Sequence, residues 1–222
     1  MLYFVQGRSG TGKTHYTANV LAEKARQGSN KLLWLIPEQS SFESETMFLK
    51  LLGPSICRNI SVMSFTRLYD MVMRLTGGFA GTPIDDGARK IIMSLAIEDC
   101  AYDLNLYKKQ AGKPQLTDLM INAVKEFKTC GISTKRLREQ SAKNKDTDLS
   151  EKLHDVSLIY DFYDAHLEGS NIDPLDNNAR LEKRIEDTCF FDGYTVAVDG
   201  FSGFTAQEMK ILMLIMKQSK DF

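Results

Sequence analysis

The residues best suited to chemistry form one glycine-rich loop near the start of the chain. The pattern GxxxxGK[ST] is completed by Gly7, Arg8, Ser9, Gly10, Thr11, Gly12, Lys13 and Thr14. Glycines allow successive backbone N–H groups to turn inward around a phosphate, and a helix that follows adds its positive N-terminus. Lys13 would reach the β- and γ-phosphates, and the Thr14 hydroxyl would bind Mg²⁺. The motif predicts a nucleotide-phosphate site; the alternative is a glycine turn without a ligand.

A second acidic position belongs to the same chemistry. P-loop NTPases hold Mg²⁺ with a carboxylate at the end of another strand, and Asp199 follows the apolar residues 194–198. In helicase-like ATPases the next residue is usually a glutamate that orients the attacking water, whereas here it is Gly200. We therefore treat Asp199 as a degenerate acidic motif and assign no catalytic residue. The alternative role for Asp199 is a turn or cap before the last helix.

Alternating strand and helix patterns are expected to position these residues. The sequence predicts strands at residues 2–6, 31–36 and 59–63, and helices at residues 13–27, 41–52 and 66–76. Such alternation is typical of a mainly parallel sheet with helices on both faces. Residues 85–187 show helical patterns and no convincing strand, and a strand at 194–198 and a helix at 206–217 follow. We therefore expect a discontinuous α/β domain (residues 1–84 and 190–222) interrupted by an all-helical insertion (residues 85–189), in the front part of a longer protein.

Composition excludes several classes of protein. The chain has 43% hydrophobic and 26% charged residues, which is ordinary for a globular protein and unlike collagen or a disordered chain. Its apolar runs are far shorter than the ~20 residues that cross a bilayer, and no secretory signal is visible. We therefore expect a cytoplasmic protein without a membrane partner. The scattered cysteines and histidines predict no metal site made only of protein ligands.

Charge by itself gives a divided prediction about nucleic acid. The net charge of −1 indicates no nucleic-acid partner for the chain as a whole. One basic run stands out, at Lys135, Arg136, Arg138, Lys143 and Lys145, with only Glu139 opposing it. Such a run follows a DNA backbone or forms a solvated helix face, and the sequence leaves both interpretations open.

Four motifs taken together resemble a known family. They are residues 7–14, residues 36–43 after the second strand, residues 62–68 after the third, and residues 198–205 with Glu208 after the insertion. In this order they are similar to the N-terminal region of the AddB-type subunits of the AddAB helicase–nuclease, an ATP-dependent helicase/deoxyribonuclease. The resemblance implies a P-loop NTPase fold, in which a superfamily-1-helicase-like parallel sheet carries an inserted helical subdomain.

The resemblance also implies a set of partners and cofactors. These are ATP and Mg²⁺, an AddA-type helicase–nuclease subunit in a heterodimer, and DNA bound by the full complex during double-strand break processing and recombinational repair. A nuclease domain and an iron–sulfur cluster belong to the missing C-terminal part of the longer protein. Lys13 and Thr14 would bind phosphate and Mg²⁺, with Asp199 as the weakened acidic site.

Four further residues occupy positions where helicases place DNA-facing loops. They are Gln39, Ser64, Phe65 and Arg67. Their alternative roles are structural, as helix caps, core residues or ion-pair partners; Ser40 or Ser41 and Phe42 in the same region would serve as a helix cap and a core residue.

The predicted function is that of a nucleotide-binding domain with weak or no ATP hydrolysis of its own. Two alternatives remain. One is a stand-alone P-loop kinase, which needs the same loop. The other is a protein or DNA docking module with a vestigial P-loop.

Overall fold

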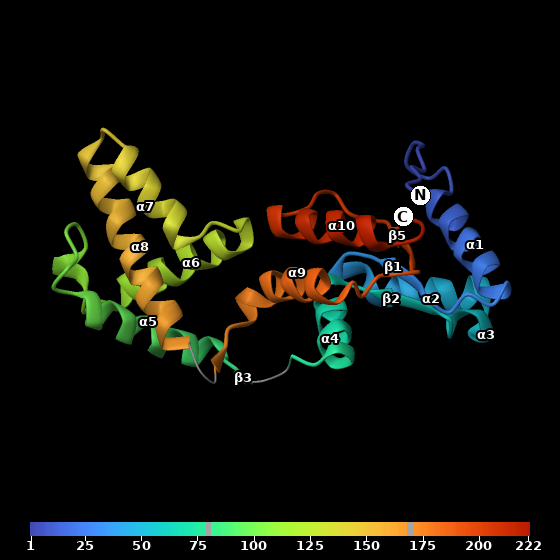
Figure 1. The fold of residues 1–222 in the computed structure, drawn as a ribbon, viewed down its shortest axis with the longest axis horizontal. Helices are drawn as coiled ribbons and strands as arrows, with labels where there is room; N and C mark the ends of the chain where they lie inside the picture. Colours follow the sequence, from blue (N-terminus) through green and yellow to red (C-terminus); the bar gives the residue numbers. More distant parts are fainter. Residues whose placement is uncertain (79–80, 168–170) are drawn as a thin grey trace. The chain divides into compact units, whose positions relative to one another are not determined.

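The chain divides into two compact units, which are described separately. The structure, a computed structural model, describes residues 1–78, 81–167 and 171–222, and their side chains except at residues 40–44. The first unit contains residues 1–78 and 178–222, and the second contains residues 79–177. Figure 1 shows the elements of both units along the chain.

A parallel sheet forms the centre of the first unit. In the described part of the chain its strands are β1 (Leu32–Leu35), β2 (Ile60–Met63) and β5 (Thr195–Val198), in the order β2–β1–β5. Both pairings are parallel and in step, so that Leu35 lies beside Met63 and Val198. All three strands therefore end at the same edge of the sheet, which is where α/β folds place their binding residues. This confirms the expected α/β class with a parallel sheet.

Helices cover both faces of this sheet because β1 is apolar on both sides. Leu32 and Trp34 pack into a core with α1 (Lys13–Arg26), α2 (Ser41–Leu52) and α3 (Pro54–Cys57). Leu33 and Leu35 pack into the other core, with α4 (Phe65–Thr76), α9 (Asn177–Thr188) and α10 (Ala206–Gln218). A continuous apolar run is the expected sequence of a strand buried on both faces. The same two groups of helices lie on either side of the sheet in Figure 1.

The strand expected at residues 2–6 is wrong for this structure. These residues have no strand assignment, and Leu2, Tyr3, Phe4 and Val5 remain 43–78% exposed. In the described part of the chain, this end pairs with the last three residues, through the Met1 amino group to Lys220 O (2.5 Å), Tyr3 N–H to Phe222 O (2.8 Å) and Phe222 N–H to Met1 O (2.8 Å). A strand requires a longer ladder of such bonds than this, so the apolar pattern alone did not produce one.

The second unit is built around helices. They are α5 (Asp86–Cys100), α6 (Pro114–Cys130), α7 (Thr134–Lys143) and α8 (Thr147–Leu167), with 3₁₀ turns at Lys108–Gln110 and Pro174–Asp176. Met93, Ile97, Met120, Ile159 and Tyr163 are almost fully buried in their shared core. The α8 helix packs against both α5 and α7. These elements agree with the helical patterns read from the sequence.

Two details of the insertion differ from the sequence prediction. The unit is not entirely helical, because β3 (Thr82–Pro83) and β4 (Asn171–Ile172) pair as two short parallel strands. Such two-residue strands are too short to leave a periodic pattern. The helix α9, expected in the insertion, belongs to the first unit, where Leu181 and Ile185 are fully buried. The structure thus divides the chain near residues 78 and 178 rather than at 85 and 189.

Two kinds of feature are absent from the described residues. None of the helices they form combines the length and apolarity that crossing a membrane requires. The same residues contain no cluster of His, Cys, Asp and Glu side chains with the arrangement of a metal site.

Candidate functional site

The glycine-rich loop has the backbone conformation that its sequence predicts. Gly10 and Gly12 have φ values of +78° and +82°, in the left-handed region that favours glycine. A side chain at Gly7 would begin only 2.6 Å from the Thr11 hydroxyl oxygen, so a larger residue there would force the Thr11 side chain to shift. Gly12 is the N-cap of α1 and offers no capping side chain. The first N–H groups of this helix therefore face outward, which suits an anion.

Lys13 folds back over the loop that precedes it. Its Nζ donates hydrogen bonds to the carbonyl oxygens of Gly7 (2.9 Å) and Arg8 (2.8 Å). The Thr11 hydroxyl donates to the same Arg8 carbonyl at 2.8 Å. The loop is thus closed by its own lysine, and the positive charge of Lys13 lies at the loop where a phosphate would need it.

Asp199 extends β5 by one residue at the sheet edge. Its N–H donates to Leu35 O (3.1 Å), and its Oδ1 accepts from the Gly200 N–H (2.9 Å). Gly200 has φ +80°, and a Cβ there would lie 3.3 Å from Pro37 Cδ. A glutamate at this position would meet both the strained backbone and the proline ring. The chain bends at Gly200 directly after Asp199, and the N-cap of the last helix is Thr205, so Asp199 does not cap that helix.

Glu208, the acidic residue of the fourth motif, has a structural partner. Its Oε2 accepts from the Thr205 N–H (2.8 Å), and the Thr205 hydroxyl accepts from the Glu208 N–H (3.2 Å). This reciprocal pair is a capping box at the start of α10. The Glu208 carboxylate is therefore held at the start of α10 by this cap. It does not take the place of the catalytic glutamate that is missing at position 200.

The two residues expected to hold Mg²⁺, Thr14 and Asp199, stand on different segments of the first unit. Among the described residues, no hydrogen bond or ion pair links Thr14 to Asp199. Asp221 and Phe222 lie between β5 and the segment that leads into the loop. Asp221 O accepts from Val196 N–H on one side (2.9 Å), and Phe222 O accepts from Tyr3 N–H on the other (2.8 Å). The loop therefore follows a segment that pairs with the C-terminal residues, and these residues in turn pair with β5.

Two of the residues expected to face DNA are buried. Ser64 is 1% exposed and is the N-cap of α4, where its Oγ accepts from the Arg67 N–H at 3.4 Å. Phe65 is 7% exposed, and its ring packs against Phe201 with centroids 5.8 Å apart. Phe201 in turn contacts Phe204 at 4.7 Å. These contacts support the structural roles of Ser64 and Phe65, and they place an aromatic cluster at the edge where the strands end.

The other two residues remain accessible. Gln39 is exposed on the 3₁₀ turn Glu38–Ser40 that follows β1. Arg67 is about half exposed and forms an ion pair with Glu45 of α2. The side chains of Ser40, Ser41 and Phe42, expected as a helix cap and a core residue, lie outside the described residues. Gln39 and Arg67 therefore remain the accessible polar groups of this set.

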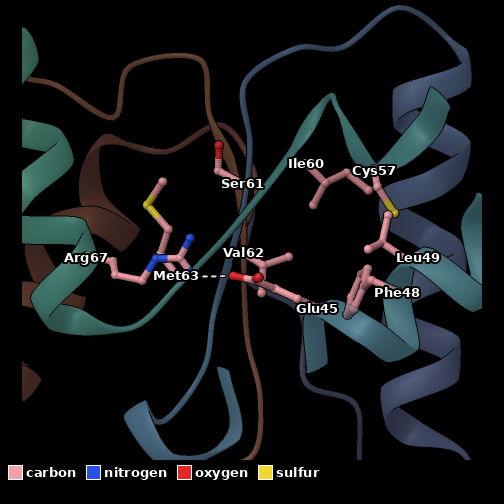
Figure 2. A pocket seen from close by; sticks show the side chains of 9 residues that line it. All are labelled: Glu45, Phe48, Leu49, Cys57, Ile60, Ser61, Val62, Met63 and Arg67. Carbon is pink, nitrogen blue, oxygen red and sulfur yellow. Dashed lines mark hydrogen bonds and ion pairs between the residues drawn. The ribbon is translucent and has the colours of Figure 1, made fainter. Parts of the chain in front are cut away.

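Arg67 and Glu45 border a pocket that the sequence did not indicate. Its volume is about 290 Å³, and its walls come from α2, α3, β2 and the start of α4. Figure 2 shows the Arg67 guanidinium directed toward the Glu45 carboxylate, with the apolar side chains Phe48, Ile60 and Val62 beyond the pair. Burial raises the pKa of the Cys57 thiol in its wall. Arg67 belongs to the motif at residues 62–68 and Glu45 to none of the four motifs, so no spacing rule predicts their contact.

Comparison with known proteins gives the family. The family described as "ADDB, N-terminal" matches residues 4–222. The chain is 30% identical over 223 residues to the B-type subunit of an ATP-dependent helicase/deoxyribonuclease from Clostridioides difficile (strain 630), covering 99% of this chain and 19% of that protein. It is 33% identical over 222 residues to a protein of the same name from Heliobacterium modesticaldum, covering 97% and 18%.

A third relative gives the same result. The protein of that name from Listeria monocytogenes serotype 4a is 28% identical over 217 residues, with 98% of this chain and 19% of the relative covered. The chain thus spans about a fifth of the length of the curated relatives it matches. Since the family match covers nearly every residue, this chain belongs to the AddB N-terminal family.

Proposed function

We propose that this chain is a nucleotide-binding domain from one subunit of a helicase–nuclease, with a P-loop NTPase fold like that of superfamily 1 helicases. The observation that carries the proposal is the loop at residues 7–14. It combines left-handed glycines, an uncapped helix N-terminus and a lysine at the same place. These features suit a triphosphate, because backbone N–H groups and the helix dipole both stabilise negative charge.

Nucleotide binding requires Lys13 to change partners. Its Nζ now satisfies the carbonyls of Gly7 and Arg8. On binding, it would exchange these neutral acceptors for charged phosphate oxygens, so that both donor and acceptor of each hydrogen bond are ionised. The Thr14 hydroxyl, in the first turn of α1, would hold Mg²⁺, with Asp199 as a weak second ligand. Bound Mg-ATP would supply the negative charge for the loop and the metal ion for Thr14 and Asp199.

We propose that hydrolysis by this domain is weak or absent. General-base catalysis needs a group positioned near the attacking water. Gly200 stands at the position where helicase-like ATPases carry that glutamate, and Pro37 and the positive φ oppose a larger residue there. Glu208 is held in its capping box. Bound nucleotide would then stabilise the fold, or report to the rest of the complex that the site is filled, instead of driving movement along DNA.

The sheet edge is proposed to face DNA in the full complex. Gln39 and Arg67 offer polar groups near the ends of β1 and β2, and the pocket beside Arg67 offers an apolar wall. Ser64 and Phe65 would act indirectly, since Ser64 caps the helix that carries Arg67 and Phe65 packs beneath it.

The remaining parts of the proposal concern the longer protein. The names of its relatives describe one of the subunits of an ATP-dependent helicase/deoxyribonuclease. We propose an AddA-type subunit as the partner in a heterodimer, double-strand break processing for recombinational repair as the role, and the cytoplasm as the location. Nuclease activity and an iron–sulfur cluster would belong to regions outside this chain.

Calorimetric titration with Mg-ATP tests the proposal. We expect micromolar binding by the parent chain and at least about tenfold weaker binding by Lys13→Ala, since each tenfold change corresponds to about 1.4 kcal/mol. Lys50→Ala removes an exposed lysine from α2 and should bind like the parent. Absence of binding by the parent would contradict the proposal and favour the docking module with a vestigial loop.

A turnover assay tests the second part separately. Hydrolysis on the order of 10 s⁻¹, lost in Lys13→Ala, would show a working motor and overturn the assignment of weak hydrolysis. Phosphoryl transfer to a small acceptor would instead favour the kinase.

A further inference from the structure

The helix α7 presents a basic face that the proposed nucleotide site does not use. Successive residues of an α-helix are rotated by about 100° and rise by about 1.5 Å. Lys135, Arg136 and Lys143 therefore lie within one arc of about 100°, spread over about 12 Å of the helix axis. Leu137 lies on the opposite face and is 5% exposed. The helix packs through Leu137 and directs the three cations to solvent.

These three cations differ from the other arginine of the helix. Arg138 forms an ion pair with Asp161 of α8. Lys135, Arg136 and Lys143 are exposed, and within the described residues no carboxylate pairs with their side chains. Glu139, the one acidic residue in the sequence of α7, lies within the same arc and is exposed, so the face carries three positive charges and one negative charge. Its net charge of about +2 still favours an external anion.

The acidic residues after α7 do not cancel this face. Asp146 is engaged at the start of α8, where its Oδ1 accepts from the N–H groups of Asp148 (3.1 Å) and Leu149 (3.3 Å). Lys145 extends the basic run beyond the helix and is exposed. Exposed positive charge therefore continues past the C-terminal end of α7, and Asp146 is used as a helix cap instead of an ion-pair partner for it.

The chemistry of the face favours duplex DNA over single-stranded DNA. Single-strand binding surfaces interleave basic residues with aromatic rings on which bases stack, and α7 contains no aromatic residue. Duplex DNA carries one negative charge per ~1.7 Å of axis, or about seven along the roughly 12 Å over which the three cations are spread. A rigid row of cations suits this dense backbone charge.

We infer that the solvent face of α7, formed by Lys135, Arg136 and Lys143, binds the phosphate backbone of double-stranded DNA. The inference rests on the proposed function in taking DNA as the substrate class. It adds a contact surface on the helical unit, separate from the sheet edge of the first unit. Binding there would be independent of base sequence, because phosphate contacts carry no sequence information.

A salt titration of DNA affinity tests this surface. The 222-residue chain is titrated with a labelled duplex of about 20 base pairs, long enough to span the face, at several salt concentrations. The variant Lys135→Gln/Arg136→Gln/Lys143→Gln keeps good helix formers in α7. Each lost phosphate contact reduces the slope of log K against log salt by about 0.9, so we expect a reduction of about 2.7. Between about 50 and 200 mM salt, the parent should then lose about 40-fold more affinity than the variant.

A matched control removes the same charge elsewhere on the helical unit. Lys109→Gln/Lys113→Gln/Lys125→Gln changes three exposed lysines outside α7, and it should keep the parent slope. If the salt slope fell equally in both variants, the effect would come from net charge alone, and the inference would be overturned. Conversely, Glu139→Gln should raise the affinity for the duplex at the lowest salt concentration.

The remaining outcomes separate this inference from the proposed function. Absence of salt-dependent duplex binding would overturn it and favour an acidic protein partner for the face. Tighter binding of a single strand of equal length would overturn the choice of duplex DNA. Mg-ATP titration of the same α7 variant should match the parent, so failure of the nucleotide site and failure of the DNA surface give different results.

Discussion

Gly200 lies against the ring of Pro37, and a Cβ at this glycine would be 3.3 Å from Pro37 Cδ. The two residues follow β5 and β1, which pair directly in the sheet. This contact restricts which side chains fit at position 200, directly after Asp199. Because φ is +80°, any side chain there meets backbone strain as well as the ring.

Gly200→Ala should therefore destabilise the chain by about 1–2 kcal/mol, the usual cost of left-handed backbone at a non-glycine residue. Gly203→Ala is the matched control, since nothing lies within 4 Å of a Cβ there. Urea unfolding measures both variants. Gly200→Glu should lose at least as much stability and gain no ATPase turnover; a stable and active Gly200→Glu would show that the missing base, and not the backbone, limits hydrolysis.

Lys128 should be a major stabilising residue of the helical unit. Its Nζ lies 2.7 Å from Asp176 Oδ2 and 3.1 Å from Asp164 Oδ1, and its side chain is 3% exposed. Removing one partner of a fully buried ion pair costs about 3–5 kcal/mol. Because Asp164 and Asp176 are 47% and 36% exposed, we expect a smaller loss of about 1.5–3 kcal/mol for Lys128→Met. Lys125→Met, on the exposed side of the same helix, should change stability by less than about 0.5 kcal/mol. Similar losses in the two variants would contradict a special role for the buried amine.

The pH dependence of this cluster follows from its charges. Burial by itself lowers the pKa of Lys128, but Asp176 and Asp164 outweigh it, and the pKa is raised above 10.5. Stability from the charged amine is therefore complete below pH 10.5 and is lost as the pH rises through the folded-state pKa. Unfolding measured from about pH 9 to about pH 12 should show this loss in the parent and not in Lys128→Met.

Asp155 anchors the connection between α5 and α6. It is fully buried, and its carboxylate accepts from the N–H groups of Asn105 (2.9 Å), Leu106 (2.8 Å) and Tyr107 (2.9 Å). Asp155→Ala leaves three donors without their acceptor, so we expect a loss of at least about 3 kcal/mol. Amide hydrogen exchange at residues 105–107 should accelerate most. Asp103→Ala, at an exposed position of the same connection, should leave these rates unchanged.

Asp221 should make the first unit sensitive to acid. Its carboxylate accepts from Lys24 Nζ at 2.7 Å, and this hydrogen bond, opposed by burial, lowers the pKa of Asp221 below 3.8. The stability it contributes is present above pH 3.8 and is lost as the pH falls through the folded-state pKa. Asp221→Asn should lower the melting temperature at about pH 7. Below about pH 4, the melting temperature of this variant should fall less with decreasing pH than that of the parent. Exposed Asp187→Asn should keep the parent profile.

Local patterns in the chain were enough to predict much of this protein. The loop at residues 7–14 depends on glycine backbone freedom, which the motif itself encodes. Buried strands such as Leu32–Leu35 and amphipathic helices such as Phe65–Thr76 arise from periodicities within a few residues. The order of four such motifs was sufficient to indicate the family before any contact between them was known.

Contacts between distant segments required the tertiary structure. Three features join residues whose separation in the sequence carries no periodic signal. They are the Glu45–Arg67 ion pair, the pocket beside it and the packing of α9 in the core of the first unit. The N-terminal apolar run shows the same limit. Its composition favours a strand, but a strand forms only where a neighbour supplies a ladder, and among the described residues this end pairs through a few bonds with Lys220 and Phe222. Side-chain type specifies what an element prefers, whereas the neighbours it meets determine the structure it adopts.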